Sequence, residues 1–124
     1  MSNTVLVVDD DPVSVSLLEL VLKRGGYQVI VSRSAPGGLQ IAADVKPNVI
    51  LIDDMMPTMT GGEMCQQLKS DPELAHIPVI MISAGTRVQD PSYVESIGAD
   101  HALSKPVLPK DVLQAVELVL SRQR

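Results

Sequence analysis

The sequence has few aromatic residues and almost no cysteine. It contains no Trp and no Phe, and Tyr27 and Tyr93 are its only two tyrosines. A packed core in this chain must therefore be aliphatic. Cys65 is the single cysteine, which excludes a disulfide within the chain and a metal site built from several thiolates. This cysteine usage is typical of a reducing compartment, and we expect a cytoplasmic protein.

Positive charge is also scarce. The chain carries 10 Lys and Arg against 15 Asp and Glu, a net charge of −5, which argues against a nucleic-acid-binding surface. No apolar run approaches the length of a membrane span, and the N-terminus lacks the pattern of a signal peptide. With 124 residues, 45% of them apolar, we expect a single domain over residues 1–124 that binds neither nucleic acid nor membrane directly.

What the sequence does contain is short apolar runs that end in acids. Residues 49–52 pass directly into Asp53 and Asp54, and Pro57 follows. Such a run, rich in Val and Ile, is typical of a strand buried on both faces in a parallel sheet. Residues 4–8 form a second run of this kind, and acids follow it too. Taken alone, these acids could be turn residues or groups that favour a helix N-terminus.

Strand-like and helix-like segments alternate along the chain. The predicted strands cover residues 4–8, 27–31, 48–53, 78–82 and 102–103, and the predicted helices cover residues 13–23, 35–45, 63–69, 88–97 and 111–120. The helix at 88–97 is weakly patterned and contains Pro91, so its start is uncertain. This alternation predicts a doubly wound (βα)5 flavodoxin-like three-layer α/β sandwich with a parallel five-stranded sheet of order 2-1-3-4-5.

Polar side chains follow four of these strands. They are Asp9, Asp10, Asp53, Ser83 and Lys105. Because the carboxyl ends of parallel strands meet at one edge, we expect these residues to converge there. Three crowded carboxylates repel one another, and a hard cation such as Mg²⁺ removes that conflict. A carboxylate, a hydroxyl, an ammonium and Mg²⁺ together suit transfer of a phosphoryl group.

A family resemblance follows from these motifs. Residues 7–11, residues 51–57 with Gly61, residues 82–84 and residues 104–106 resemble the signature set of two-component response-regulator receiver domains. The resemblance implies a phosphoacceptor signalling module that turns over no metabolite. Its phosphodonor would be a sensor histidine kinase or a histidine phosphotransfer protein, and phosphorylation would change its binding to a downstream protein. A monomer or a weak phosphorylation-dependent dimer is expected.

The resemblance also implies roles for single residues. Asp53 would be the phosphoacceptor, Ser83 would contact the phosphoryl group and Lys105 would pair with it. Receivers usually carry an aromatic residue three places before this lysine, where this chain has Ala102, so this chain lacks the ring on which the family's switch depends. His101 is adjacent, but neighbouring residues on a strand face opposite sides, and we expect an exposed or edge histidine rather than a substitute switch.

The implied metal site has ligands from two strand ends. Asp10 would bind Mg²⁺ directly and Asp9 mainly through water, with Asp53 and backbone carbonyl groups after it, at Asp54 and Met55, as further ligands. Two other functions remain open. One is a small aspartate-nucleophile phosphohydrolase, although its usual second acid would fall at Met55. The other is a receiver fold that serves only as an interaction surface.

Overall fold

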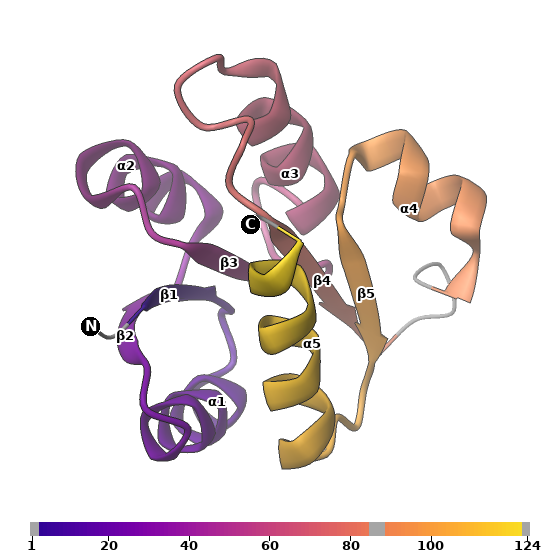
Figure 1. Cartoon of the computed structure of the whole chain (residues 1–124). Coiled ribbons are helices and arrows are strands. Elements are labelled where there is room, and N and C mark those ends of the chain that lie inside the picture. The colour runs from indigo at the N-terminus through magenta and orange to yellow at the C-terminus, as the bar shows by residue number, and fades with distance from the viewer. Residues whose placement is uncertain (1–2, 85–88, 123–124) are drawn as a thin grey trace.

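The computed structural model describes residues 3–84 and 89–122. Within these ranges five strands alternate with five helices (Figure 1). The elements are β1 (Thr4–Val8), α1 (Pro12–Arg24), β2 (Gln28–Ser32), α2 (Ala35–Val45), β3 (Val49–Asp53), α3 (Gly61–Ser70), β4 (Val79–Ser83), α4 (Pro91–Ile97), β5 (His101–Ser104) and α5 (Pro109–Ser121). All strand pairs are parallel and the strand order is β2-β1-β3-β4-β5, which confirms the predicted topology.

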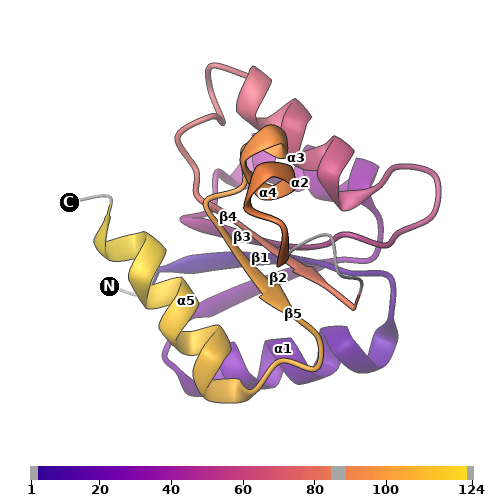
Figure 2. The ribbon, with the colours of Figure 1, turned by 90° about the vertical axis from the view of Figure 1, so that its right-hand side faces the viewer.

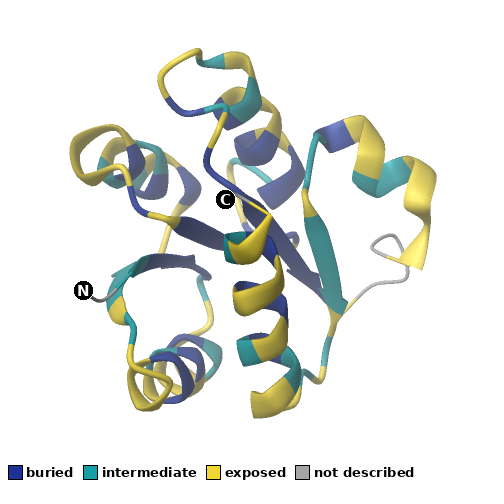
Figure 3. Ribbon diagram, viewed as in Figure 1, coloured by how far each residue is buried: buried dark blue, intermediate teal, exposed yellow. Residues whose placement is uncertain are grey.

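The helices cover both faces of the sheet. Helices α1 and α5 pack on one face, and α2, α3 and α4 pack on the other (Figures 1 and 2). The sheet itself is buried between them, and the exposed residues lie mainly on the outer faces of the helices (Figure 3). None of the helices in the described residues is long and apolar enough to cross a membrane.

The core has two halves because side chains alternate along each strand. In β3, Ile50 and Ile52 pack beneath α2, α3 and α4, whereas Val49 and Leu51 pack beneath α1 and α5. Every residue of β3 and β4 is buried, as expected for central strands of a parallel sheet. The same alternation directs Asp53 and the residue after it, Asp54, to opposite faces.

Helix α3 begins two residues earlier than the sequence predicts. We expected Gly61 and Gly62 in a loop, but the helix starts at Gly61. Thr60 and Glu63 form a capping box: the Thr60 hydroxyl accepts a hydrogen bond from the backbone N–H of Glu63 at 3.1 Å, and the Glu63 carboxylate accepts one from the N–H of Thr60 at 3.0 Å. These two bonds satisfy donors at the helix start and outweigh the low helix propensity of glycine.

Other boundaries also differ from the prediction. Strands β2 and β4 each begin and end one residue later than predicted, β5 is longer than its predicted two residues, and α5 starts at Pro109, a residue suited to the first helical turn. The described part of α4 begins at Pro91 with Asp90 as its N-cap. The predicted start of this helix at residue 88 lies outside the described residues.

Candidate functional site

Three carboxylates converge at the carboxyl edge of the sheet. Asp9 and Asp10 follow β1, Asp53 ends β3, and these two strands are neighbours. One carboxylate oxygen from each residue lies within 4.8 Å of the others. Asp9 and Asp53 are buried, with 2% and 6% of their surface exposed, and Asp10 is half-buried. The convergence predicted from the strand ends is therefore observed.

Lys105 supplies positive charge to this cluster. Its Nζ lies 3.5 Å from Oδ2 of Asp9 and 3.6 Å from Oδ1 of Asp53. Its backbone N–H donates a hydrogen bond of 2.9 Å to the carbonyl of Ser83, which fixes the segment after β5 to the end of β4. The peptide bond between Lys105 and Pro106 is cis. The Lys105 ammonium thus faces the acids from the segment that follows β5.

The pKa of Asp53 reflects the crowding of carboxylates in the pocket. Burial, and after it the nearby Asp9 carboxylate, raise the pKa of its carboxyl to about 6, although Lys105 and the backbone N–H of Met55 oppose the rise. One ammonium does not compensate the crowded carboxylates. A divalent cation with oxygen ligands would, and the donor set of three carboxylates fits Mg²⁺.

The loop after β1 is held by hydrogen bonds that the sequence did not reveal. The Asp9 carboxylate accepts one of 3.0 Å from the backbone N–H of Asp11. Asp11 caps α1, and the Ser14 hydroxyl, which donates to its carboxylate at 2.8 Å, lowers its pKa. Arg33 donates two hydrogen bonds, of 3.2 and 3.1 Å, to the carbonyl of Asp10. Asp11 is therefore engaged by the helix, and Asp9 and Asp10 are left facing the pocket.

The remaining predicted site residues lie at the same edge. Ser83 ends β4, is fully buried, and follows Ile82, the residue paired with Asp53. The side chain of Met55 is exposed, and its backbone N–H donates to Oδ1 of Asp53 at 3.4 Å. The structure thus places both residues beside Asp53.

Asp54 points away from the acidic cluster. Its carbonyl accepts a hydrogen bond of 3.1 Å from the N–H of Gly61, and its side chain is fully buried and accepts one of 2.9 Å from the Tyr93 hydroxyl. The carbonyl is thus directed toward α3, which does not fit the metal-ligand role expected for Asp54, and the carbonyl of Met55 remains an expected ligand. No sequence motif pointed to the contact between Asp54 and Tyr93, which are 39 positions apart.

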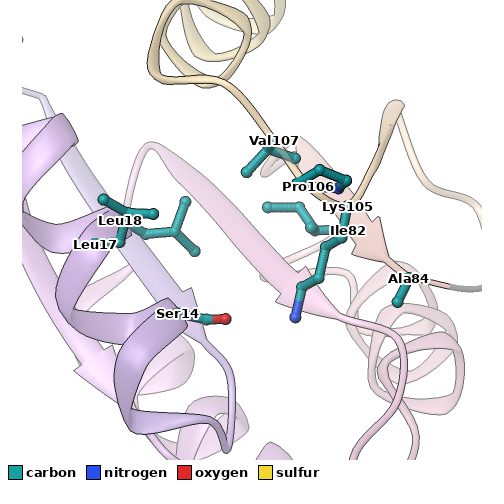
Figure 4. A pocket seen from close by; sticks show the side chains of 8 residues that line it. All are labelled: Ser14, Leu17, Leu18, Ile82, Ala84, Lys105, Pro106 and Val107. Atoms are coloured by element: carbon teal, nitrogen blue, oxygen red, sulfur yellow. The ribbon is translucent and has the colours of Figure 1, made fainter.

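An apolar groove of about 380 Å³ borders Lys105 (Figure 4). It runs between α1 and the segment after β5, and it is lined by Ser14, Leu17, Leu18, Ile82, Ala84, Lys105, Pro106 and Val107. Leu17 on its rim is half exposed, and Val13, one turn earlier on α1, is mostly exposed. A protein that reaches Asp53 from solvent therefore meets an apolar surface next to the acids.

Comparison with known proteins agrees with this geometry. Residues 5–117 match the response regulator receiver domain family. The chain belongs to this family. It is 43% identical over 111 residues to the response regulator PleD of Caulobacter vibrioides, an alignment that covers 86% of this chain and 24% of PleD. Protein PilH of Pseudomonas aeruginosa is 32% identical over 117 residues, which cover 94% of this chain and 97% of PilH. The receiver therefore spans about a quarter of PleD and almost all of PilH.

Solved structures share the same fold. The chemotaxis protein CheY4 of Vibrio cholerae superposes with a TM-score of 0.90 at 27% identity, covering 97% of this chain and all of CheY4. Receiver domains are phosphoacceptor signalling modules, and a histidine kinase is the phosphodonor that membership of the family implies. The acidic triad of this receiver is typical of the metal site of such domains.

The structure also locates Ala102, which departs from the family pattern, and its neighbour His101. Ala102 packs against the core half beneath α2, α3 and α4. His101 is half-buried and lines a cavity on the α5 side together with Leu103. The side chains of Ala102 and His101 therefore face opposite sides of the sheet, as predicted. Burial lowers the pKa of His101, and Arg122 lowers it further, which favours the neutral imidazole.

Proposed function

We propose that this receiver accepts a phosphoryl group on Asp53 from a phosphohistidine donor, with Mg²⁺ as cofactor, and then changes its binding to a partner protein. The observation that carries the proposal is the position of Asp53. One of its carboxylate oxygens lies within 4.8 Å of oxygens of Asp9 and Asp10, and Oδ1 lies 3.6 Å from the Lys105 ammonium.

In the proposed step, an oxygen of Asp53 attacks the phosphorus of the donor. A phosphorus–oxygen bond forms, the phosphorus–nitrogen bond to the donor imidazole breaks, and the electron pair of that bond remains on the nitrogen. Because the other ring nitrogen of the donor phosphohistidine carries a proton, the products are an acyl phosphate on Asp53 and a neutral histidine. Lys105 pairs with the phosphoryl oxygens, and the Ser83 hydroxyl, at the end of the neighbouring strand, donates to one of them.

The ligands that would hold Mg²⁺ are the carboxylates of Asp10 and Asp53 and, mainly through water, that of Asp9. The carbonyl of Met55 would be a further ligand. Bound there, the ion supplies positive charge against the oxygens of the incoming phosphoryl group. Asp53 must be ionised to attack, and its raised pKa of about 6 leaves it mostly ionised at neutral pH. Asp9 and Asp10 therefore hold the cofactor, while Asp53 both binds it and reacts.

The phosphodonor must cover the surface around Asp53 to bring its imidazole to the carboxylate. The exposed apolar side chains of Val13 and Leu17 lie beside the groove that borders Lys105. We propose that this α1 surface contacts the histidine kinase or phosphotransfer protein. A small donor such as acetyl phosphate does not need that surface. We also propose that the receiver acts in the cytoplasm and turns over no substrate.

Incubation with acetyl phosphate and Mg²⁺, followed by intact-mass measurement, tests the function. The proposal predicts one phosphoryl group per chain, no adduct when a chelator removes Mg²⁺, and no adduct in Asp53→Asn. The matched control is Asp54→Asn, which removes the adjacent carboxylate and should still form the adduct. An unmodified wild-type chain would refute the proposal. Catalytic release of phosphate without an adduct would instead support an aspartate-nucleophile phosphohydrolase.

A further inference from the structure

We propose that Tyr93 is a positioning residue that couples the state of Asp53 to α4 through its hydrogen bond to Asp54. The inference rests on the proposed phosphorylation of Asp53. In the resting structure the Tyr93 hydroxyl donates a hydrogen bond of 2.9 Å to Oδ1 of Asp54. We infer that this bond belongs to the resting conformation and breaks when Asp53 is phosphorylated.

The contact is buried and closely packed. Asp54 has no exposed surface, and the Tyr93 ring packs against the core half beneath α2, α3 and α4. A Cβ on Gly62, at the start of α3, would lie 2.7 Å from the Tyr93 oxygen and 3.7 Å from Oδ1 of Asp54. Only a residue without a side chain leaves room for the pair there. A hydrogen bond to a buried carboxylate is stronger than one between neutral groups, so this contact fixes Tyr93 firmly.

The backbone connects Asp54 rigidly to the phosphoacceptor. Residues 53 and 54 share a peptide bond, and the N–H of Asp54 donates to the carbonyl of Ile82 in β4 at 2.9 Å. The carbonyl of Asp54 accepts from Gly61, whose Cα packs so closely on the carbonyl of Asp53 that a Cβ would collide with it. A shift of the Asp53 backbone toward a phosphoryl group and its cation therefore moves the Asp54 carboxylate as well.

Helix α4 is held to the rest of the receiver by few buried groups. It is seven residues long, and Ile97 is its one buried residue. The bond from Tyr93 to Asp54 joins this helix directly to the residue after β3, and breaking the bond would loosen α4 relative to β3. Coupling of this kind is reciprocal, so removal of the hydroxyl must also change the affinity of the site for a phosphoryl mimic.

Tyrosine fluorescence tests the proposal directly because the chain has no Trp and only two Tyr. In Tyr27→Phe, Tyr93 is the sole fluorophore. The chain is titrated with beryllofluoride in Mg²⁺, and bound beryllofluoride is measured in parallel by fluorine NMR. Because a hydrogen-bonded carboxylate quenches phenol emission, we expect the Tyr93 emission to rise along the same curve as bound beryllofluoride.

A second variant tests reciprocity. Tyr93→Phe keeps the ring and removes the hydroxyl, and we expect its half-saturating concentration of beryllofluoride to fall about fivefold or more relative to wild type. Tyr27→Phe, the same change at the other tyrosine, should leave that concentration unchanged. Saturation with unchanged Tyr93 emission, or an unchanged or higher half-saturating concentration in Tyr93→Phe, would overturn the inference alone. Failure of the wild-type chain to bind beryllofluoride would overturn the proposed function and the inference together.

Discussion

Replacing Asp53 with Asn should stabilise the metal-free receiver at neutral pH. Burial and the Asp9 carboxylate raise the pKa of Asp53 from 3.8 to about 6 in the folded chain. Between these pH values the folded chain holds a proton that the unfolded chain has lost. The contribution of Asp53 to the stability of the wild-type chain therefore falls as the pH rises through this window, and the loss is nearly complete above pH 6.

The expected gain follows from the same values. Raising a carboxyl pKa from 3.8 to about 6 corresponds to about 3 kcal/mol of lost stability above pH 6. The amide of the variant avoids this cost because it carries no charge, but it also gives up the interaction with Lys105 at 3.6 Å. We therefore predict that Asp53→Asn raises the free energy of unfolding by about 1–2 kcal/mol at pH 7.5, and that this gain disappears near pH 4.

Urea unfolding followed by circular dichroism, with a chelator present, measures this difference at both pH values. Adding Mg²⁺ provides an internal control: the ion stabilises the folded wild-type chain by mass action and binds Asp53→Asn more weakly, so the gain should shrink. The reasoning is refuted if Asp53→Asn is no more stable than wild type at pH 7.5, or if its gain is the same at pH 4.

Three further predictions concern other parts of the receiver. The Lys69 ammonium is mostly buried and donates to Asp100 at 2.9 Å and to two backbone carbonyls. Lys69→Met should therefore lower the free energy of unfolding by about 1–3 kcal/mol. Lys46→Met, which removes an exposed ion pair, should lower it by less than about 0.5 kcal/mol. Equal losses in urea unfolding would contradict this. Cys65 in α3 is fully buried, and burial raises its pKa to about 12. Iodoacetamide should therefore leave it unmodified in the native chain at pH 8. Fast labelling would contradict this and show that α3 opens. Leu17→Glu places a charge on the α1 surface and should slow phosphotransfer from a histidine phosphotransfer protein at least tenfold, with the rate from acetyl phosphate unchanged; equal slowing with both donors would point to damage of the site itself.

The sequence predicted the sheet and the acidic pocket because both depend on local patterns. Apolar runs without alternation identify the strands of a parallel sheet, and in that topology the residues after β1 and β3 must meet. The sequence alone therefore predicts that Asp9, Asp10, Asp53 and Lys105 meet at one edge of the sheet, and the structure confirms it.

The sequence did not predict contacts that depend on how the helices pack. Tyr93 lies in a short, weakly patterned helix, and nothing in its sequence neighbourhood indicates that its hydroxyl reaches Asp54. Arg33, which donates to the carbonyl of Asp10, was missed for the same reason. The direction of the Asp54 carbonyl was also misjudged, because it is set by Gly61 at the start of α3, a helix we expected to begin later. These features are fixed by tertiary packing.

The identity of the phosphorylated residue tests the account most directly. Borohydride reduces an acyl phosphate to an alcohol and so marks the residue that carried it. After treatment of the receiver with acetyl phosphate and Mg²⁺, reduction and peptide mass mapping should find the mark on Asp53 alone. A mark on Asp54, on Asp9 or Asp10, or on no residue at all would contradict the assignment of this pocket.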